Sequence, residues 1–196
     1  SGVAVISSDA EGVEISPKRF MDLHGHGSLV LNSVKNDAID WLEGSDVEGG
    51  LARAIDQATA VLAAAMMGSA REALEQTVTY LGEREQFDVK LGTFQALQHR
   101  CAQIYCELEL AESAVAAALT GLDKGESNIS ALVSSAKALA NDCFTLISGE
   151  AVQLHGGMGV TEEMDIGLFL KRSRVCNQLL GSSSYHRDRF ASLQGF

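Results

Sequence analysis

Two short stretches of the sequence combine residue types that bind anionic ligands. The first runs from Tyr80 to Asp88 and places Arg84 two residues before Gln86, in a loop between two expected helices. An arginine is a bidentate partner for phosphate oxygens. The second covers residues 153–161 (QLHGGMGVT) and places three glycines where a helix is expected to end. Glycines let a backbone approach a ligand closely and expose N–H donors to anions.

Each stretch has a plainer interpretation when it is taken alone. A glycine-rich segment after a helix is usually a C-cap and turn. A lone arginine in a loop is usually a solvated charge. Neither stretch is a Rossmann or Walker signature, since the Gly-Gly-Met-Gly run ends a helix and does not open one after a strand. A phosphate site therefore requires that the fold bring the two stretches together.

The composition argues against several functional classes. The net charge is -11, whereas a nucleic-acid partner calls for clustered lysine and arginine. No apolar run reaches the ~18 residues that cross a bilayer, so no membrane association is expected. The four cysteines form no CxxC pair, which indicates reduced thiols in a cytoplasmic protein, with neither a disulfide framework nor a metal site. The first residues lack the basic region of a signal peptide, and the chain reads as one entered in the middle.

The elements that must position the two stretches fall into two parts. Residues 1–46 contain three short runs with β-branched residues and partial alternation, which are expected to be strands: Val3–Ile6, Gly12–Ile15 and Ser28–Val34. They predict a partial antiparallel β-domain with unpaired edges. The only proline is Pro17. The absence of proline after residue 46 suits long helices, because a proline inside a helix costs ~3 kcal/mol.

Residues 47–196 are expected to form a helical bundle domain. Apolar residues from Leu51 to Leu81 follow the three-and-four spacing of a helix with one buried face. Further helices are expected from about Phe94 to the turn at 121–125, from a cap at Ser127 or Asn128 to Gly156, over about 162–179, and from about Ser184. Long amphipathic helices joined by short loops predict a mainly α protein, an up-and-down helical bundle preceded by the partial β-domain.

The combined motifs resemble the acyl-CoA dehydrogenase family. The sequence contains Arg-x-Gln-Phe, then Phe-Gln about seven residues on, then Gln-x-x-Gly-Gly-x-Gly about sixty residues later, and then Arg-x-Arg. The resemblance covers essentially the whole chain. Residues 12–44 look like the second half of the family's middle β-domain, and residues 51–196 are similar to its C-terminal helical domain. The family's N-terminal helical domain has no counterpart here.

The resemblance implies a role for both stretches in binding FAD. In this family the diphosphate and adenosine of FAD reach into the helical domain of a neighbouring subunit. Arg84 is then expected on the diphosphate, with Gln86, Phe87 and Gln95 nearby. Contacts to the ADP portion across an interface are expected from Gln153, Leu154, His155, Gly156 and Gly157. Asp88 departs from the family, which usually has glycine there, and adds a negative charge close to the phosphate position.

The resemblance also indicates that the catalytic base is missing. Acyl-CoA dehydrogenation needs a carboxylate in an apolar pocket to remove the α-proton, because burial raises the pKa of that group toward the working range. The family places this glutamate at one of two positions, which hold Leu180 and Ala58 here. Neither side chain accepts a proton. Asp56 should point away around its helix, and Glu43 has no motif support.

Two serines after Leu180 are further FAD candidates. Ser182 and Ser184 are small hydroxyl residues where the family's threonine meets the flavin. Taken without the resemblance, the same segment is typical of a serine-rich turn between two short helices.

The leading interpretation is a subunit without catalytic glutamate in a heteromeric acyl-CoA dehydrogenase. Some family members pair such a subunit with one that keeps the glutamate, notably in bacterial degradation of steroid side chains. The resemblance implies a homo- or hetero-oligomer, a dimer of dimers, with the acyl-CoA bound mainly by absent regions or by the partner. Two alternatives stay open: an acyl-CoA oxidase-like or monooxygenase-like flavoprotein, and a flavin-free helical scaffold or interaction subunit.

Overall fold

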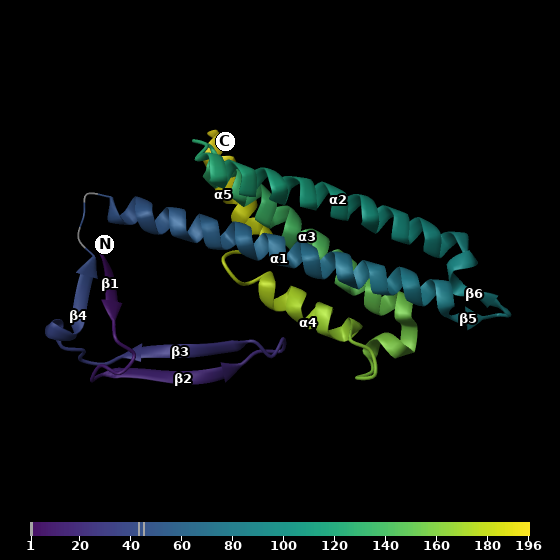
Figure 1. The fold of residues 1–196 in the computed structure, drawn as a ribbon, viewed down its shortest axis with the longest axis horizontal. Coiled ribbons are helices and arrows are strands. Elements are labelled where there is room, and N and C mark those ends of the chain that lie inside the picture. Colours follow the sequence, from purple (N-terminus) through teal and green to yellow (C-terminus); the bar gives the residue numbers. More distant parts are fainter. Residues whose placement is uncertain (1, 43, 45) are drawn as a thin grey trace. The chain divides into compact units, whose positions relative to one another are not determined.

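The computed structural model describes residues 2–42, 44 and 46–196, and Figure 1 shows its ribbon. The chain divides into two compact units, residues 1–55 and 56–196. The domain boundary that the sequence places after residue 46 stays a prediction; the first helix begins at the next residue, Val47.

The first unit contains two antiparallel strand pairs. Strand β1 (Val3–Ile6) pairs with β4 (Ile39–Leu42), and β2 (Val13–Arg19) pairs with β3 (Gly25–Leu31). A 3-10 turn at Asn36–Ala38 precedes β4. The strands predicted near residues 12 and 28 are therefore present with shifted bounds. Pro17 lies within β2 opposite Gly27, a position that a two-stranded ladder tolerates because an edge strand has N–H groups with no ladder partner.

The second unit is a helical bundle, as the sequence predicts. Its elements are the part of α1 (Val47–Glu83) from residue 56 onward, the strands β5 (Glu85–Gln86) and β6 (Val89–Lys90), α2 (Gln95–Lys124), α3 (Ile129–His155), α4 (Ile166–Cys176) and α5 (Ser183–Gln194), with 3-10 turns at Leu91–Thr93 and Gly156–Val160. The long helices α1, α2 and α3 alternate in direction along the bundle (Figure 1).

Helix α3 is the centre of the bundle and packs against α2, α4 and α5. Its Phe144 and Ile147 are fully buried, and burial of each such side chain stabilises the fold by ~1.5–3 kcal/mol. Helix α1 contributes a run of small residues, and Ala60, Ala63 and Ala70 are also fully buried. Small side chains let neighbouring backbones approach closely, so the slim middle of α1 suits its place in the core.

Three local predictions are wrong in detail. Helix α4 ends at Cys176, short of the predicted residue 179, because the following segment turns into a left-handed conformation at Leu180 (φ 57°). The expected loop over residues 82–93 contains the β5–β6 hairpin. Asn128 is the N-cap of α3, but its side chain makes no capping hydrogen bond.

The bundle offers no structural sign of a disulfide or a metal centre. All four cysteines are free, and Cys143 and Cys176 are buried. Burial raises the pKa of the Cys143 thiol to about 12, so this thiol is an inert core residue. Within the described ranges, no cluster of three or more His, Cys, Asp or Glu side chains could hold a metal ion. The same residues include no helix whose length and apolarity would let it span a membrane.

Candidate functional site

A hollow at one end of the bundle joins the two stretches that the sequence singles out. We call it the hairpin hollow; its volume is about 500 Å³, and it is lined by Tyr80, Arg84, Gln86, Leu91, Gln153, Leu154, His155, Gly156, Gly157, Met158 and Thr161. The lining comes from the end of α1, the β5–β6 hairpin, the end of α3 and the turn that follows it. The loop arginine and the late glycines, about seventy residues apart in sequence, therefore share one site.

Arg84 lies at the junction of α1 and the hairpin. Its backbone N–H donates to the Tyr80 carbonyl at 2.8 Å, and its own carbonyl accepts from the Leu91 N–H at 2.8 Å. These bonds fix the backbone of Arg84 while leaving its side chain exposed. Among the described residues, the guanidinium has no ion pair and no hydrogen bond. It is free to pair with an anion.

The glycine turn forms the opposite wall. Gly156 ends α3 with φ 59° and ψ -136°, a left-handed φ that favours glycine. A Cβ added at Gly156 or Gly157 would meet nothing within 4 Å. A side chain at position 157 would therefore fit within this chain. The absence of one leaves room for a ligand to approach the backbone.

His155 supplies a buried polar atom with no partner of its own. Its ring stacks on Tyr80 with centroids 4.3 Å apart, and Nδ1 lies 2.8 Å from the Ala151 carbonyl. Because a carbonyl only accepts, Nδ1 carries the proton, and in the neutral ring Nε2 is left as an acceptor. Nε2 is buried and has no partner among the described residues. A buried polar atom of this kind calls for a ligand or an ordered water.

The hairpin that follows Arg84 has a two-residue turn in an unusual sequence. Glu85 pairs with Lys90 and Gln86 with Val89, so Phe87 and Asp88 are the turn residues, and their φ values are 56° and 62°. Two positive φ values define a type I′ turn, which favours Asn-Gly or Asp-Gly. The glycine expected in the family thus has a conformational reason at position 88. Aspartate tolerates the left-handed region better than most residues.

We expect Asp88→Gly to raise the free energy of unfolding by ~0.5–1 kcal/mol, because glycine adopts this turn without strain. The Asp88→Ala variant is the matched control: it removes the same charge but keeps a Cβ, and it should be less stable than the wild type. Urea denaturation of the wild type and the two variants measures the order of their free energies of unfolding. Equal stabilisation by glycine and alanine would assign the effect to charge and contradict the backbone explanation.

The remaining predicted site residues do not line the hairpin hollow. Phe87 is 82% exposed and contacts Phe94 edge-on with ring centroids 6.1 Å apart. Gln95 is the exposed first residue of α2. Ser182 is the N-cap of α5, where its Oγ accepts from the Tyr185 N–H at 3.3 Å and lies 3.0 Å from the Ser184 Oγ. Helix α5 lies at the other end of the bundle from the hairpin (Figure 1).

The two positions of the expected base lie on α1 and before α5. Ala58 is on an exposed face of α1, and Leu180 is 41% exposed. Asp56 is buried and is held by Arg189 of α5 at 2.7 Å and by the Ser130 hydroxyl at 2.6 Å. It is therefore committed to a structural ion pair. Glu43 lies outside the described residues.

Four residues that line the hairpin hollow were not predicted as site residues: Tyr80, Leu91, Met158 and Thr161. A signal for Tyr80 exists in the sequence, because it lies four residues before Arg84, which is one helical turn along the chain.

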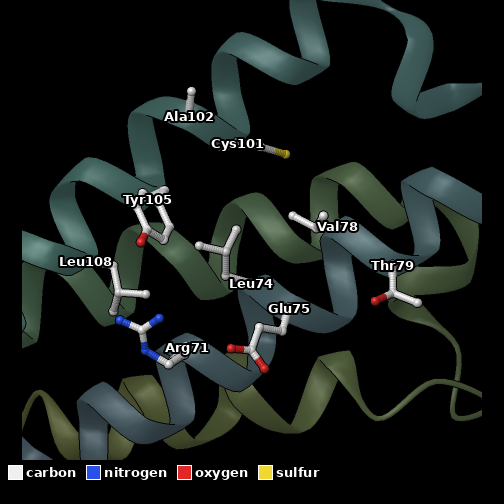
Figure 2. Close-up of a pocket in the computed structure, with 9 residues that line it drawn as sticks. All are labelled: Arg71, Leu74, Glu75, Val78, Thr79, Cys101, Ala102, Tyr105 and Leu108. Atoms are coloured by element: carbon white, nitrogen blue, oxygen red, sulfur yellow. The ribbon is translucent and has the colours of Figure 1, made fainter.

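A second hollow lies between α1 and α2 and has a volume of about 610 Å³ (Figure 2). Its lining is mainly apolar and includes Leu74, Val78 and Leu108. Its one arginine, Arg71, donates from Nε to Glu112 and from a terminal nitrogen to Glu109, each at 2.8 Å. These hydrogen bonds raise the pKa of Arg71. The cation is already neutralised, so this hollow is a poorer anion site than the hairpin hollow.

The residues of the hairpin hollow fit a nucleoside diphosphate group. An unpaired arginine suits the diphosphate. The glycine turn leaves space for close backbone contact. The orphan Nε2 of His155 suits a hydroxyl or amino donor of the nucleoside.

Comparisons with known proteins relate the chain to one family. Residues 51–193 match the family model described as "Acyl-CoA dehydrogenase, C-terminal domain". Acyl-CoA dehydrogenase IpdE2 of Mycolicibacterium smegmatis is 37% identical over 64% of this chain and 39% of its own length. Acyl-CoA dehydrogenase FadE34 of Mycobacterium tuberculosis is 36% identical over 72% of this chain and 20% of its own length. The chain thus spans well under half of these two relatives.

Solved structures share the fold of the whole chain. A variant of the Tcur3481–Tcur3483 steroid ACAD matches with a TM-score of 0.87 and 29% identity, over 98% of this chain and 51% of that one. The ChsE4–ChsE5 complex from Mycobacterium tuberculosis matches with a TM-score of 0.89 and 24% identity, over 100% of this chain and 52% of that one. With a family model covering residues 51–193, the chain belongs to the acyl-CoA dehydrogenase family and contains its C-terminal helical domain.

Proposed function

We propose that this chain is part of an acyl-CoA dehydrogenase-like subunit that lends FAD-binding surface to an adjoining subunit and lacks a catalytic base of its own. The observation that carries the proposal is the hairpin hollow, where an unpaired Arg84 and the glycine turn at residues 156–157 line one site. An ADP-like group is the part of FAD that fits this lining.

Each lining residue has a distinct task in this proposal. Arg84 would hold the diphosphate, since a guanidinium can pair with phosphate oxygens through two N–H donors. The backbone at Gly156 and Gly157 admits the same group closely, because no Cβ fills the space. His155, fixed by its bond to Ala151 and by its stack on Tyr80, lines the same hollow and would contact the adenosine portion. The bound FAD would supply the hydride acceptor for dehydrogenation of the acyl-CoA.

The removal of the α-proton needs a base that this chain does not offer at either family position. Leucine at 180 and alanine at 58 have no proton acceptor, and the carboxylate of Asp56 is occupied by Arg189 and Ser130. Both oxygens of this carboxylate are bonded to Arg189 and Ser130, so they face these partners and not a substrate. We therefore assign the base to a partner subunit.

The names of two structural relatives support a two-component assembly acting on steroid-derived substrates. One is a steroid ACAD with two named components, and another is a complex of two named proteins. By analogy, this chain would work beside a glutamate-bearing subunit on the CoA thioester of a steroid side chain, in a dimer of dimers in the cytoplasm.

Co-purification from the native host tests this proposal directly. The full-length protein that contains this chain is tagged and purified, its partner is identified by mass spectrometry, and the absorbance at flavin wavelengths is recorded. Dehydrogenation of acyl-CoA thioesters is assayed with an artificial electron acceptor. We expect a yellow complex with a glutamate-bearing partner, and activity only when both subunits are present.

Three outcomes would contradict parts of the proposal. Full activity of the subunit alone would show that a base exists within it. A colourless complex would favour the helical scaffold. A yellow protein that reduces oxygen in place of the artificial acceptor would favour oxidase-like or monooxygenase-like chemistry.

A further inference from the structure

The segment between α4 and α5, residues 177–182, follows a strained backbone path. We call it the connector. Leu180 has φ 57°, and Gly181 follows with φ 109°. A left-handed residue with a Cβ costs ~1–2 kcal/mol. A Cβ at Gly181 would lie 2.5 Å from the Tyr185 ring and 2.8 Å from the His186 ring. Such a path persists only where surrounding contacts hold it.

A buried lysine holds the two ends of the connector. Lys137 of α3 is fully buried. Its Nζ donates to the Asn141 Oδ1 at 2.6 Å, to the Cys176 carbonyl at 3.0 Å and to the Gly181 carbonyl at 3.2 Å. An ammonium has three donors and no acceptor, so all three N–H groups have partners. Two of the three acceptors are backbone carbonyls, one at Cys176 directly before the connector and one at Gly181 within it.

Two further side chains hold the same backbone. Asn141 Nδ2 donates to the Gly181 carbonyl at 3.2 Å, and Nε2 of the buried His186 lies 2.8 Å from the Leu180 carbonyl. The carbonyls of residues 180 and 181 are thus fixed from α3 and α5, while the Leu180 side chain stays partly exposed. Hydrogen bonds thus fix the backbone of the connector at residues 180 and 181, next to the partly exposed Leu180 side chain.

We propose that Lys137 is a positioning residue that fixes the connector and thereby the placement of the side chain at position 180. This inference rests on the proposed function only in that position 180 is where the family's base would stand. The bonds of Lys137 concentrate on the connector and not on the α2–α3 core, so its loss should free this segment and leave the remaining bundle folded.

The plainer interpretation is a core lysine that serves overall stability. A buried charge is costly, and apolar residues of similar volume often replace such groups without loss. Here, a methionine at 137 would leave the carbonyls of Cys176 and Gly181 without their lysine partner. The two interpretations differ in where the disturbance falls, which a local measurement can decide.

Hydrogen–deuterium exchange at pH 7 on the full-length protein measures that disturbance. The Asn177, Gln178 and Leu179 amides donate to the Ser173 and Val175 carbonyls, so they report on the connector. We expect Lys137→Met to speed their exchange by about tenfold or more and to leave α2 peptides unchanged. Lys171→Met, which removes an exposed lysine from α4, is the matched control and should leave both regions unchanged. If Lys137→Met does not fold, Asn141→Ala removes part of the same network and should give a smaller effect of the same kind.

A pH profile tests whether opening of the connector exposes the Lys137 amine. Burial lowers the pKa of Lys137 to about 8 from 10.5. Opening the connector admits water and returns the pKa of the amine toward its ordinary value. Above pH 8 the open form therefore binds the proton more tightly, so opening becomes less favourable as pH rises. From pH 8 to 9, protection of the connector amides, corrected for intrinsic exchange, should rise up to about tenfold in the wild type and stay flat in Lys137→Met.

Other groups that face Lys137 are controlled separately. Burial lowers the pKa of His186 on α5, so this ring titrates below the measured range. Arg189 and Asp56, which also act on His186, form an ion pair with each other. The Cys176 thiol on α4 faces the amine, and thiols ordinarily titrate near ~8.5. The comparison is therefore repeated in a Cys176→Ala background.

Three results would each overturn the positioning role of Lys137. They are equally faster amide exchange in all helices, no faster exchange in a folded Lys137→Met protein, and the same pH profile with and without Lys137. The exchange experiment does not depend on flavin. Faster connector exchange in Lys137→Met, in a protein that binds no flavin, would support the positioning role and reject the proposed function. Unchanged connector exchange in a protein that binds flavin would reject the positioning role and retain the proposed function.

Discussion

Replacing Arg84 with alanine is expected to weaken FAD retention by roughly 1.5–3 kcal/mol, about ten- to a hundredfold in the dissociation constant. The guanidinium lines the hairpin hollow and has no competing partner among the described side chains. Its loss removes a charge-assisted hydrogen bond and leaves the ligand's diphosphate without its cation. Flavin content after gel filtration of the complete subunit assembly, followed by FAD titration of the apoprotein, gives the change in affinity.

Two further variants separate geometry from charge at this site. Arg84→Lys keeps the positive charge but loses the planar fork, so it should give an intermediate loss. Lys124→Ala removes a positive charge at the opposite end of α2 and should leave FAD retention unchanged. All three should unfold within ~0.5 kcal/mol of the wild type, because Arg84 is exposed and makes no contact that stabilises the bundle. Unchanged flavin content in Arg84→Ala would reject the phosphate role.

The long helices are predictable from the sequence because nothing in it competes with them. Helix α1 spans 37 residues without a proline, and its apolar spacing persists from Leu51 to Leu81. Ala60, Ala63 and Ala70 on the same helix are fully buried. Each of these signals acts locally and agrees with the global fold, which makes such elements recoverable without an alignment.

The β5–β6 hairpin is invisible to the same reasoning for a physical reason. Its strands have two residues each, too few to show a period. Its turn residues are Phe87 and Asp88, and this pair is not the Asn-Gly or Asp-Gly signal that marks a type I′ turn. The bond from the Leu91 N–H to the Arg84 carbonyl extends the pairing by one step, directly after α1 ends.

The candidate site is predictable as a set of residue types but not as a geometry. Arg84 and the glycine turn were predicted to converge, and both line the hairpin hollow. The stack of Tyr80 on His155, the buried and unpartnered Nε2, and the grip of Lys137 on the connector depend on distances between helices. Sequence spacing within one helix carries no information about these contacts.

Asp56→Ala is expected to have the largest effect on stability, about 3–5 kcal/mol in the free energy of unfolding. The carboxylate is 3% exposed and Arg189 is 26% exposed. Two nitrogens of Arg189 donate to the two oxygens of Asp56 at 2.7 and 3.0 Å, and the hydrogen bond to Asp56 raises the pKa of Arg189. Removing Asp56 leaves a partly buried guanidinium without its counter-ion. A lower urea midpoint at an unchanged m-value would report this loss.

A second ion pair of α5 supplies the control for this prediction. Arg187 pairs with Asp142, and their side chains are 61% and 46% exposed. Breaking that pair with Asp142→Ala should cost less than ~1 kcal/mol, because solvent screens an exposed pair. The double variant Asp56→Ala/Arg189→Leu should recover part of the loss, since it also removes the unpaired charge. Equal losses in Asp56→Ala and Asp142→Ala would contradict a buried structural role and would reopen Asp56 as a carboxylate available for proton transfer.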